Sequence, residues 1–433
     1  MPAADDPIAL LLDGRYPDPG TGELLRAESR AVVIEDSLAG REAELLTALG
    51  LGPRLAVISD ANTFAALGER IERAISGTFT VQRIVLDGVF DADIETIARL
   101  AAALDPRTDA VVAVGSGTLN DLSKMVALER GCPQAVFATA PSMNGYTSLS
   151  ASITGGGVKR SVRAATPVGV FFDLGVLAQA PLPMIRAGLG DSVCRSTAQA
   201  DWLLSHLLLD RPYLETPFAL LAVDEDALFG QARALVSGDL GAMRSLVRTL
   251  VLSGFGMTIA GGSFPASQGE HLLSHYIEMM HPPGVVEALH GAQVGVCTLA
   301  MAGLQGAILA REAPPAVHAS TITLDDLLAR FGPFAGAACW AELAPKLFDE
   351  TTAEQLTARL ATSWDRIRAR IDAVSLGVAK LRDVLLAAGA PTSPDELGWP
   401  AALLADALGH AREIRNRYTF LDFSADLSAS AGR

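Results

Sequence analysis

The sequence predicts an α/β N-terminal domain with a Rossmann-like parallel sheet, followed by an all-α C-terminal domain. In the first 180 residues, short β-branched runs alternate with amphipathic helical stretches, which is the pattern of a parallel sheet with helices on both faces. After residue 182 strand signals almost vanish, and windows rich in Ala and Leu predict helices. We therefore expect one domain over 1–182, a second over 183–433, and a site in the cleft between them.

Each predicted strand is a near-continuous apolar run, which suits burial on both faces of a sheet. The strands are expected at 31–35, 54–59, 81–87, 110–116 and 134–140, with helices between them at 42–50, 63–76, 93–104 and 119–131. The segments 155–163 and 167–174 predict an extra pair of strands before the domain boundary. In the second half, helices are expected over 192–209, 226–238 and 341–348.

The composition limits the class of protein. With 50% hydrophobic and 19% charged residues in 433, the chain can bury a large core, which excludes a disordered protein. A net charge of −15 argues against nucleic-acid binding and requires a local basic pocket for any anionic substrate. We expect no signal peptide and no membrane span. Four cysteines without a CxxC pair indicate a reduced, cytoplasmic protein.

Two polar turns follow neighbouring predicted strands. The strand at 110–116 leads into Gly115-Ser116-Gly117 and a helix beginning near Leu119, and such a glycine turn lets backbone N–H groups approach a phosphate. The next strand ends in the polar stretch 139–148. Ligands of open parallel sheets bind at the carboxyl ends of strands, so these turns predict a dinucleotide site. Asp60 can bind a ribose or simply cap a helix.

Three of the seven histidines lie within twenty positions: His271, His275 and His290. Residues four apart share one face of a helix, so the first two can look into one pocket. Imidazole is a common ligand of divalent metals, and a catalytic site needs about three protein ligands and an open position. A solvated polar face is the alternative for an isolated HxxxH pair.

Together these segments resemble the metal-dependent glycerol dehydrogenase superfamily, which includes the iron-containing alcohol dehydrogenases and is related to dehydroquinate synthase. Within it the chain is most similar to the bacterial branch of the sn-glycerol-1-phosphate dehydrogenases. The similarity rests on the order and spacing of VGSGTLNDLSK, ATAPSMNGYTSLSASI, AGLGD, GEHLLSH, LHGAQVGV and RNRYTFLD. It implies a dehydroquinate synthase-like fold, NAD(H) or NADP(H), and a Zn, Ni or Fe ion. It also implies a homodimer or a larger homo-oligomer.

The resemblance also implies roles for individual residues. Asp191, His271 and His290 match the metal ligands, and Asp191 and His275 match substrate-contacting positions. The positions that match coenzyme-binding residues are Asp60, Gly115, Ser116, Gly117, Thr118, Leu119, Asn120, Asp121, Thr139, Ala140, Pro141, Ser142 and Ser148.

One position departs from the family. The residue after the PSM motif is commonly an Asp that contacts substrate, whereas here it is Asn144, which cannot take a proton. Asn144 can still contact a substrate hydroxyl, or it can merely form an Asn-Gly turn. For a phosphate, Lys159 in GGGVKRSVR is the candidate cation, and a solvated hairpin is its alternative. Lys124 can serve a pyrophosphate or pair with Asp121.

The leading hypothesis is an NAD(P)-dependent, metal-dependent enzyme that interconverts dihydroxyacetone phosphate and sn-glycerol 1-phosphate, with His275, Asn144 and Asp191 as catalytic residues. Such an enzyme would serve phospholipid biosynthesis. His275 can relay a proton or grip a hydroxyl, or it can be a buried structural histidine. The alternatives are a dehydrogenase for another small polyol or carbonyl, a cyclase resembling dehydroquinate synthase, and a non-catalytic protein that keeps the scaffold.

Overall fold

The computed structural model describes residues 6–155, 158–280 and 288–428. The chain forms two compact units: unit 1 is Met1–Ser192 with Leu214–Ser263, and unit 2 is Val193–Tyr213 with Phe264–Arg433. This division differs from the expected boundary after residue 182, because a helical segment returns to unit 1. In that segment Arg244 donates to the Ile34 carbonyl oxygen at 2.6 Å and pairs with Asp36 at 2.7 Å.

A six-stranded parallel sheet forms the centre of unit 1, with the order β3-β10-β7-β6-β4-β5. All five predicted strands of the first half are confirmed. The strands are β3 (Ala31–Glu35), β4 (Arg54–Asp60), β5 (Thr80–Leu86), β6 (Ala110–Gly115), β7 (Gln134–Ala138) and β10 (Gly169–Asp173).

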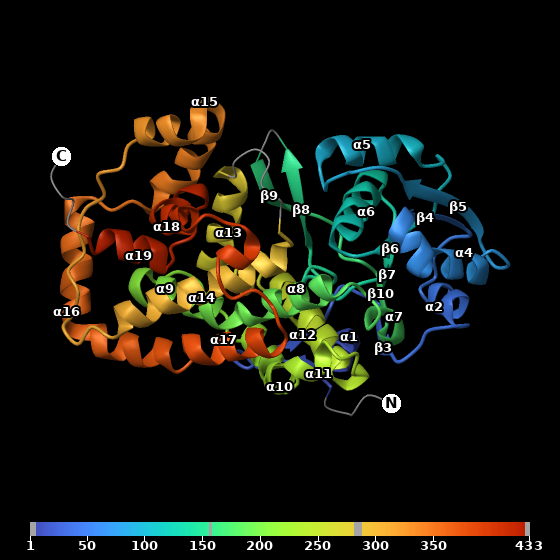
Figure 1. The fold of residues 1–433 in the computed structure, drawn as a ribbon, viewed down its shortest axis with the longest axis horizontal. Coiled ribbons are helices and arrows are strands. Elements are labelled where there is room, and N and C mark those ends of the chain that lie inside the picture. Colours follow the sequence, from blue (N-terminus) through green and yellow to red (C-terminus); the bar gives the residue numbers. More distant parts are fainter. Residues whose placement is uncertain (1–5, 156–157, 281–287, 429–433) are drawn as a thin grey trace. The chain divides into compact units, whose positions relative to one another are not determined.

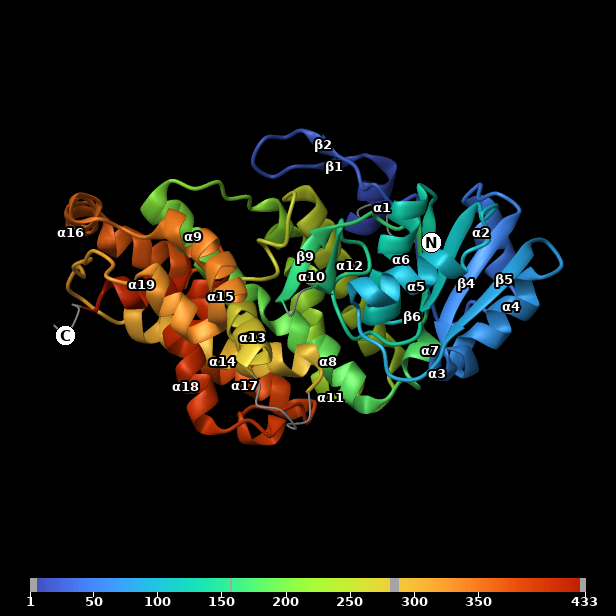
Figure 2. The ribbon, with the colours of Figure 1, turned by 90° about the horizontal axis from the view of Figure 1, so that it is seen from above.

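Helices cover both faces of this sheet (Figure 1 and Figure 2). Alternate residues of β4 face opposite ways: Ala56 and Ile58 pack with α5 (Ile94–Ala103) and α6 (Gly117–Arg130). Leu55 and Val57 pack with α2 (Glu42–Ala48) and α4 (Glu69–Ile75). The other helices of unit 1, α2 and α4 included, are α1 (Pro7–Asp13), α2 (Glu42–Ala48), α3 (Ala61–Thr63), a π-helical turn (Phe64–Gly68), α4 (Glu69–Ile75), α7 (Leu174–Leu177), α8 (Leu182–Val193), α10 (Thr216–Gly230), α11 (Ala232–Leu235) and α12 (Leu240–Ile259).

The predicted extra pair of strands is wrong as a pair. β9 (Val158–Arg163) forms an antiparallel hairpin with β8 (Ser150–Gly155), which the sequence reading missed. β10 instead lies between β3 and β7 in the parallel sheet. All five residues of β10 are buried, so its apolar side chains suit an interior strand with helices on both faces. A second short hairpin joins β1 (Tyr16–Pro17) to β2 (Leu24–Leu25).

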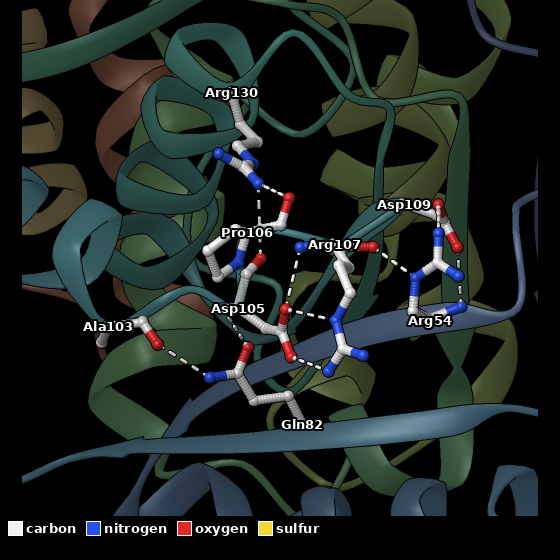
Figure 3. Close-up of polar contacts among 8 residues, drawn as sticks. All are labelled: Arg54, Gln82, Ala103, Asp105, Pro106, Arg107, Asp109 and Arg130. Carbon is white, nitrogen blue, oxygen red and sulfur yellow. Dashed lines mark hydrogen bonds and ion pairs between the residues drawn. The ribbon is translucent and has the colours of Figure 1, made fainter.

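Polar contacts tie together the amino ends of three strands of the sheet (Figure 3). Arg54, at the start of β4, donates to Asp109 at 2.7 Å and to the Arg107 carbonyl oxygen at 2.5 Å. Arg107 binds Asp105, whose backbone N–H donates to Gln82 of β5 at 2.9 Å. These contacts stabilise the amino ends of the strands. Ligands of parallel sheets bind at the opposite, carboxyl ends.

Unit 2 is all-helical over the residues that the structure describes, as predicted. Its core includes Tyr276, Met301 and Trp364. α14 (His290–Leu309) is long and apolar enough to cross a membrane, but 61% of its apolar window is buried inside the protein, as in a core helix. The helices are α9 (Arg195–Leu209), α13 (Gly269–Met280), α14 (His290–Leu309), α15 (Leu324–Leu343), α16 (Glu350–Asp372), α17 (Val378–Ala387), α18 (Ala401–His410) and α19 (Phe420–Asp426), with 3-10 turns at Ala344–Lys346, Asp395–Leu397 and Ala411–Ile414.

Candidate active site

The two predicted polar turns are neighbours at the carboxyl edge of the sheet. Gly115 of β6 is opposite Ala138 of β7, and the N–H of Thr139 donates to the Gly115 carbonyl oxygen at 3.2 Å. α6 begins at Gly117, two residues before the predicted start, with Ser116 as N-cap. The first N–H groups of this helix therefore face the strand ends, where a helix N-terminus favours an anion.

The side chains that follow Gly117 serve the protein itself, apart from the exposed Thr118. Leu119 is buried beneath Gly115. Asn120 accepts a hydrogen bond from Gln134 at 3.3 Å, and Asp121 accepts one from the N–H of Ser152 at 2.8 Å. What this turn offers a ligand is therefore its backbone N–H groups rather than the side chains of the predicted residues 119–121.

Lys124 holds the end of the second polar turn, at residues 145–150, through hydrogen bonds. Its buried ammonium donates to the carbonyl oxygens of Gly145 at 2.6 Å, Ser148 at 2.9 Å and Ser150 at 3.1 Å, and to the Ser148 hydroxyl at 3.2 Å. Burial lowers the pKa of Lys124 to about 8, against the favourable charge of Asp121. The predicted partner Asp121 acts on Lys124 through its charge. The ammonium donates its hydrogen bonds to backbone carbonyls and to the Ser148 hydroxyl instead.

Asp60 caps a helix. Its carboxylate accepts from the N–H of Thr63 at 2.7 Å, and the Thr63 hydroxyl accepts from the N–H of Asp60 at 2.9 Å. This capping box holds the carboxylate at the end of β4, next to β6 in the sheet. The structure therefore confirms the helix cap, and the contact with a ribose stays a prediction.

The turn at 139–148 also packs closely on two helices of unit 1. A Cβ at Gly188 of α8 would overlap the carbonyl oxygen of Pro141, and one at Gly254 of α12 would overlap the Thr147 hydroxyl. The N–H of Asn144 donates to the Asp191 carboxylate at 2.8 Å. Two of the predicted site residues are thus joined directly, and the position of the turn is set by helices far away in the sequence.

In unit 2 the three predicted histidines form one cluster. The ring centroids of His271 and His290 lie 5.2 Å apart, those of His275 and His290 5.6 Å, and those of His271 and His275 6.0 Å. His271 and His275 are one turn apart on α13, and His290 opens α14, which packs on it. His271 and His275 are buried, and His290 is partly exposed, so the solvated-face alternative is wrong.

Glu270 orients the first of these rings. Its carboxylate lies 2.9 Å from His271 Nδ1 and accepts from the Thr197 hydroxyl at 3.0 Å. Burial raises the pKa of Glu270, but hydrogen bonds with His271 and with backbone N–H groups lower it, and the pKa lies below its usual value. An ionised carboxylate requires a proton on Nδ1, which leaves Nε2 as the lone-pair nitrogen. This is the usual arrangement of a metal-binding histidine and its carboxylate partner.

The partner of His275 has a different chemistry. Arg415 Nη2 lies 3.1 Å from His275 Nδ1. A guanidinium is only a donor, so Nδ1 is the acceptor and the ring proton of a neutral His275 is on Nε2. The ring therefore presents an N–H donor on its other side, which suits gripping an oxygen of a ligand more than accepting its proton.

The geometry of unit 2 fits a divalent metal. One ligand nitrogen of His271 and one of His290 lie within 4.8 Å of one another, a separation that two ligands of one ion can have at Zn–N distances of about 2.1 Å. Asp191, the third predicted ligand, is a buried residue of α8. It precedes Cys194 by three residues, and the Cys194 sulfur lies within 4.8 Å of ligand atoms of Glu270 and His271.

Comparison with known proteins identifies the family of the chain. The iron-containing alcohol dehydrogenase family matches residues 33–181. The glycerol-1-phosphate dehydrogenase [NAD(P)+] of Geobacillus stearothermophilus is 31% identical over 408 residues, which cover 92% of this chain and 93% of the relative. The chain belongs to the glycerol-1-phosphate dehydrogenase family. The glycerol-1-phosphate dehydrogenase [NAD(P)+] of Bacillus velezensis is 29% identical over 376 residues, which cover 84% of this chain and 83% of the relative. The chain is thus an oxidoreductase of this family.

Solved structures share the fold of this family member. The sulfoacetaldehyde reductase of Bifidobacterium kashiwanohense superposes with a TM-score of 0.58 at 15% identity, covering 93% of this chain and 97% of that one. The glycerol dehydrogenase of Schizosaccharomyces pombe gives a TM-score of 0.55 at 17% identity, covering 86% and 93%. At such identities the likeness establishes the fold alone, and it confirms the fold class expected from the sequence.

Sequence analysis missed two residues that contact the predicted histidines, Glu270 and Arg415. Glu270 is adjacent to His271 in GEHLLSH, so this neighbouring histidine was the signal that could have found it. Arg415 lies in RNRYTFLD, a segment used only for the resemblance. Lys159, predicted for the phosphate, pairs with Thr154 in the β8–β9 hairpin. Its side chain lies outside the described part of the chain.

Proposed function

We propose that this family member catalyses the NAD(P)-dependent interconversion of dihydroxyacetone phosphate and sn-glycerol 1-phosphate. The observation that carries the proposal is the 31% identity to a glycerol-1-phosphate dehydrogenase over nearly the full length of both chains. The histidine cluster and the Glu270 carboxylate beside His271 support it. Hydride transfer to a ketone needs an electrophile at the ketone oxygen, and a metal bound by these histidines would supply one.

We propose His271, His290 and Asp191 as the ligands of one divalent ion. Two imidazoles and a carboxylate suit Zn, Ni or Fe. When bound, the metal supplies a Lewis acid that polarises the substrate oxygen. Glu270 keeps Nε2 of His271 available as a ligand. The N–H of Asn144 neutralises part of the charge of Asp191 and fixes its orientation.

We propose the first turn of α6 and the turn at 139–148 as the binding site of NAD(H) or NADP(H). The backbone N–H groups at Gly117 and Thr118 would hold the pyrophosphate, and Asp60 would contact the adenosine ribose. The nicotinamide supplies or accepts the hydride. Lys124 and Ser148 would act indirectly, because they hold the turn rather than point out of it.

His275 is proposed to bind the substrate. Its Nε2–H would donate to a substrate oxygen, since Arg415 occupies the Nδ1 side of the ring. Asn144 would contact the same substrate through its amide, which can donate and accept but cannot carry a proton. These residues therefore orient the substrate. The proton taken up when the ketone is reduced, or released when the alcohol is oxidised, has to be exchanged with water or with another group.

The test is reduction of dihydroxyacetone phosphate by purified protein. The protein is stripped with a chelator, reloaded separately with Zn, Ni and Fe(II), and assayed by the absorbance of NADH and of NADPH at 340 nm. We expect activity with at least one metal, and the sn-1 enantiomer as product by chiral analysis. The absence of oxidation with every metal, or formation of the sn-3 enantiomer, contradicts the proposal.

Asn144 favours one second candidate, a dehydrogenase for another small polyol or carbonyl. The amide replaces the Asp that family members commonly carry there, so the substrate contact differs in charge. A panel of phosphorylated and neutral carbonyls separates the two: the first proposal requires dihydroxyacetone phosphate to give the highest kcat/KM. We also propose a cytoplasmic homodimer or larger homo-oligomer, which sedimentation of the metal-loaded protein can measure.

A further inference from the structure

The segment Arg412–Tyr418 of unit 2 is held rigidly beside α13. The buried ammonium of Lys346 donates to the carbonyl oxygens of Arg412 at 2.7 Å and Arg417 at 2.8 Å, and it pairs with Asp422 at 2.8 Å. The N–H of Asn416 donates to Glu342 at 3.0 Å. The side chains of Lys346 and Glu342 thus hold the backbone from which Arg415 and Arg417 extend.

The two arginines of this segment reach different parts of α13 and the loop before it. Arg417 donates to the carbonyl oxygen of Ser267 and lies over the Phe264 ring, 4.9 Å from its centroid. Arg415 reaches His275, on the next turn after the metal-ligand candidate His271. Burial, and then the charge of Arg415, lower the pKa of Arg417 to about 9. The two positive charges are therefore close enough to repel each other inside the protein.

Arg415 is incompletely compensated within the described residues. Its guanidinium has five N–H donors, and among residues 6–155, 158–280 and 288–428 the one side-chain hydrogen bond it makes is to His275. No carboxylate oxygen of those residues lies within 4.0 Å of it. Glu342 and Glu278 act only at longer range. Arg415 is partly exposed, so a ligand can reach its remaining donors, and a guanidinium without an ion-pair partner favours an anion there.

We propose that Arg415 binds the phosphate group of the substrate next to His275. The inference rests on the proposed function and deepens it, because it assigns the cation that distinguishes a phosphorylated from a neutral substrate. A guanidinium fork matches two phosphate oxygens. His275, whose proton is on Nε2, would hold another oxygen of the same substrate. Because the net charge of the chain is −15, an anionic substrate needs a local cation of this kind.

The experiment compares Arg415→Gln and Arg415→Lys with the matched control Arg359→Gln. Arg359 belongs to the same unit but forms a surface pair with Asp210 at 2.6 Å. Each metal-loaded protein is assayed with dihydroxyacetone phosphate and with dihydroxyacetone. We expect Arg415→Gln to lose about 100-fold or more in kcat/KM with the phosphorylated substrate, chiefly through KM, because two charge-assisted hydrogen bonds are lost. With dihydroxyacetone the change should stay below about threefold.

Arg415→Lys should lie between the wild type and Arg415→Gln, since an ammonium keeps the charge but not the fork. An equal loss with both substrates overturns the proposal, because it shows that Arg415 only positions His275. Unchanged kinetics of Arg415→Gln also overturn it. Near-identical circular dichroism of all four proteins establishes that the variants fold.

A second readout separates this inference from the proposed function. Inorganic phosphate should raise the Tm of the wild type and of Arg359→Gln but not of Arg415→Gln, whether or not dihydroxyacetone phosphate is a substrate. If the wild type fails to reduce that substrate, this phosphate-dependent shift still supports an anion site at Arg415. The absence of any phosphate effect on the wild type, or an equal shift in Arg415→Gln, overturns the site.

Discussion

The close contact between α8 and the turn at 139–148 makes Gly188→Ala a severe change. A methyl group at this position would lie 2.9 Å from the Pro141 carbonyl carbon and would overlap its oxygen, whereas real Cβ atoms essentially never come within 3.0 Å of another heavy atom. Both partners are backbone atoms, so neither can rotate away. Either α8 or the turn must move, and the turn carries Ser142 and Asn144 of the proposed site.

The size of the effect follows from two opposing contributions. Alanine in a helix is favoured over glycine by about 1 kcal/mol, while overpacking typically costs about 1–3 kcal/mol. Because the clash here is with backbone atoms, we take the upper half of this range, about 2–3 kcal/mol. We expect a net loss of about 1–2 kcal/mol in the free energy of unfolding, or a Tm lowered by about 2–8 °C. Displacement of the turn should also raise the KM for the coenzyme by about tenfold or more.

The matched control is Gly230→Ala, at the end of α10 in the same unit. No heavy atom lies within 4 Å of a Cβ built there, so this change should leave the Tm unchanged or raise it slightly. Differential scanning fluorimetry and coenzyme titrations with both variants give the comparison. If Gly188→Ala unfolds at the same temperature as Gly230→Ala and binds coenzyme like the wild type, the contact with Pro141 does not have the role assigned to it.

Three further changes test other parts of the site. Glu270→Gln removes the carboxylate that orients His271, and metal affinity measured by competition with a chromophoric chelator should fall about 10–100-fold; an unchanged affinity contradicts the assigned orientation. Because burial lowers the pKa of Lys124 from 10.5 to about 8, the native state binds fewer protons than the unfolded state between these values. The free energy of unfolding should therefore rise with pH across that window by up to about 3 kcal/mol relative to that of Lys124→Met. Urea unfolding of both proteins at pH 8 and pH 10 measures this difference, and an equal change with pH in the two proteins contradicts the prediction. Arg107→Ala, at the opposite edge of the sheet (Figure 3), should leave kcat and both KM values within about twofold of the wild type because its partners are surface and backbone groups.

Much of the fold is encoded locally. Runs such as AVVAVG and QAVFA fix strands because β-branched and apolar side chains suit a buried sheet, and the helices between them follow the 3.6-residue period. The spacing of His271 and His275 places both rings on one side of a helix for the same reason. The glycine turn after β6 also follows from the local sequence. These parts of the site could be predicted before any contact was known.

The partners of His275 and of the turn at 139–148 could not be predicted, because they come from distant parts of the chain. His275 and Arg415 are 140 residues apart, and Thr147 and Val251 are 104 apart. β10 lies between β3 and β7, two strands from different parts of the chain, so its place in the sheet could not be derived from its own residues. The sequence determined which side chains could bind a metal, a phosphate or a coenzyme. The tertiary structure decided the tautomer of His275 and the burial of Lys124, because both depend on which donor or carbonyl from elsewhere in the chain lies within hydrogen-bond distance.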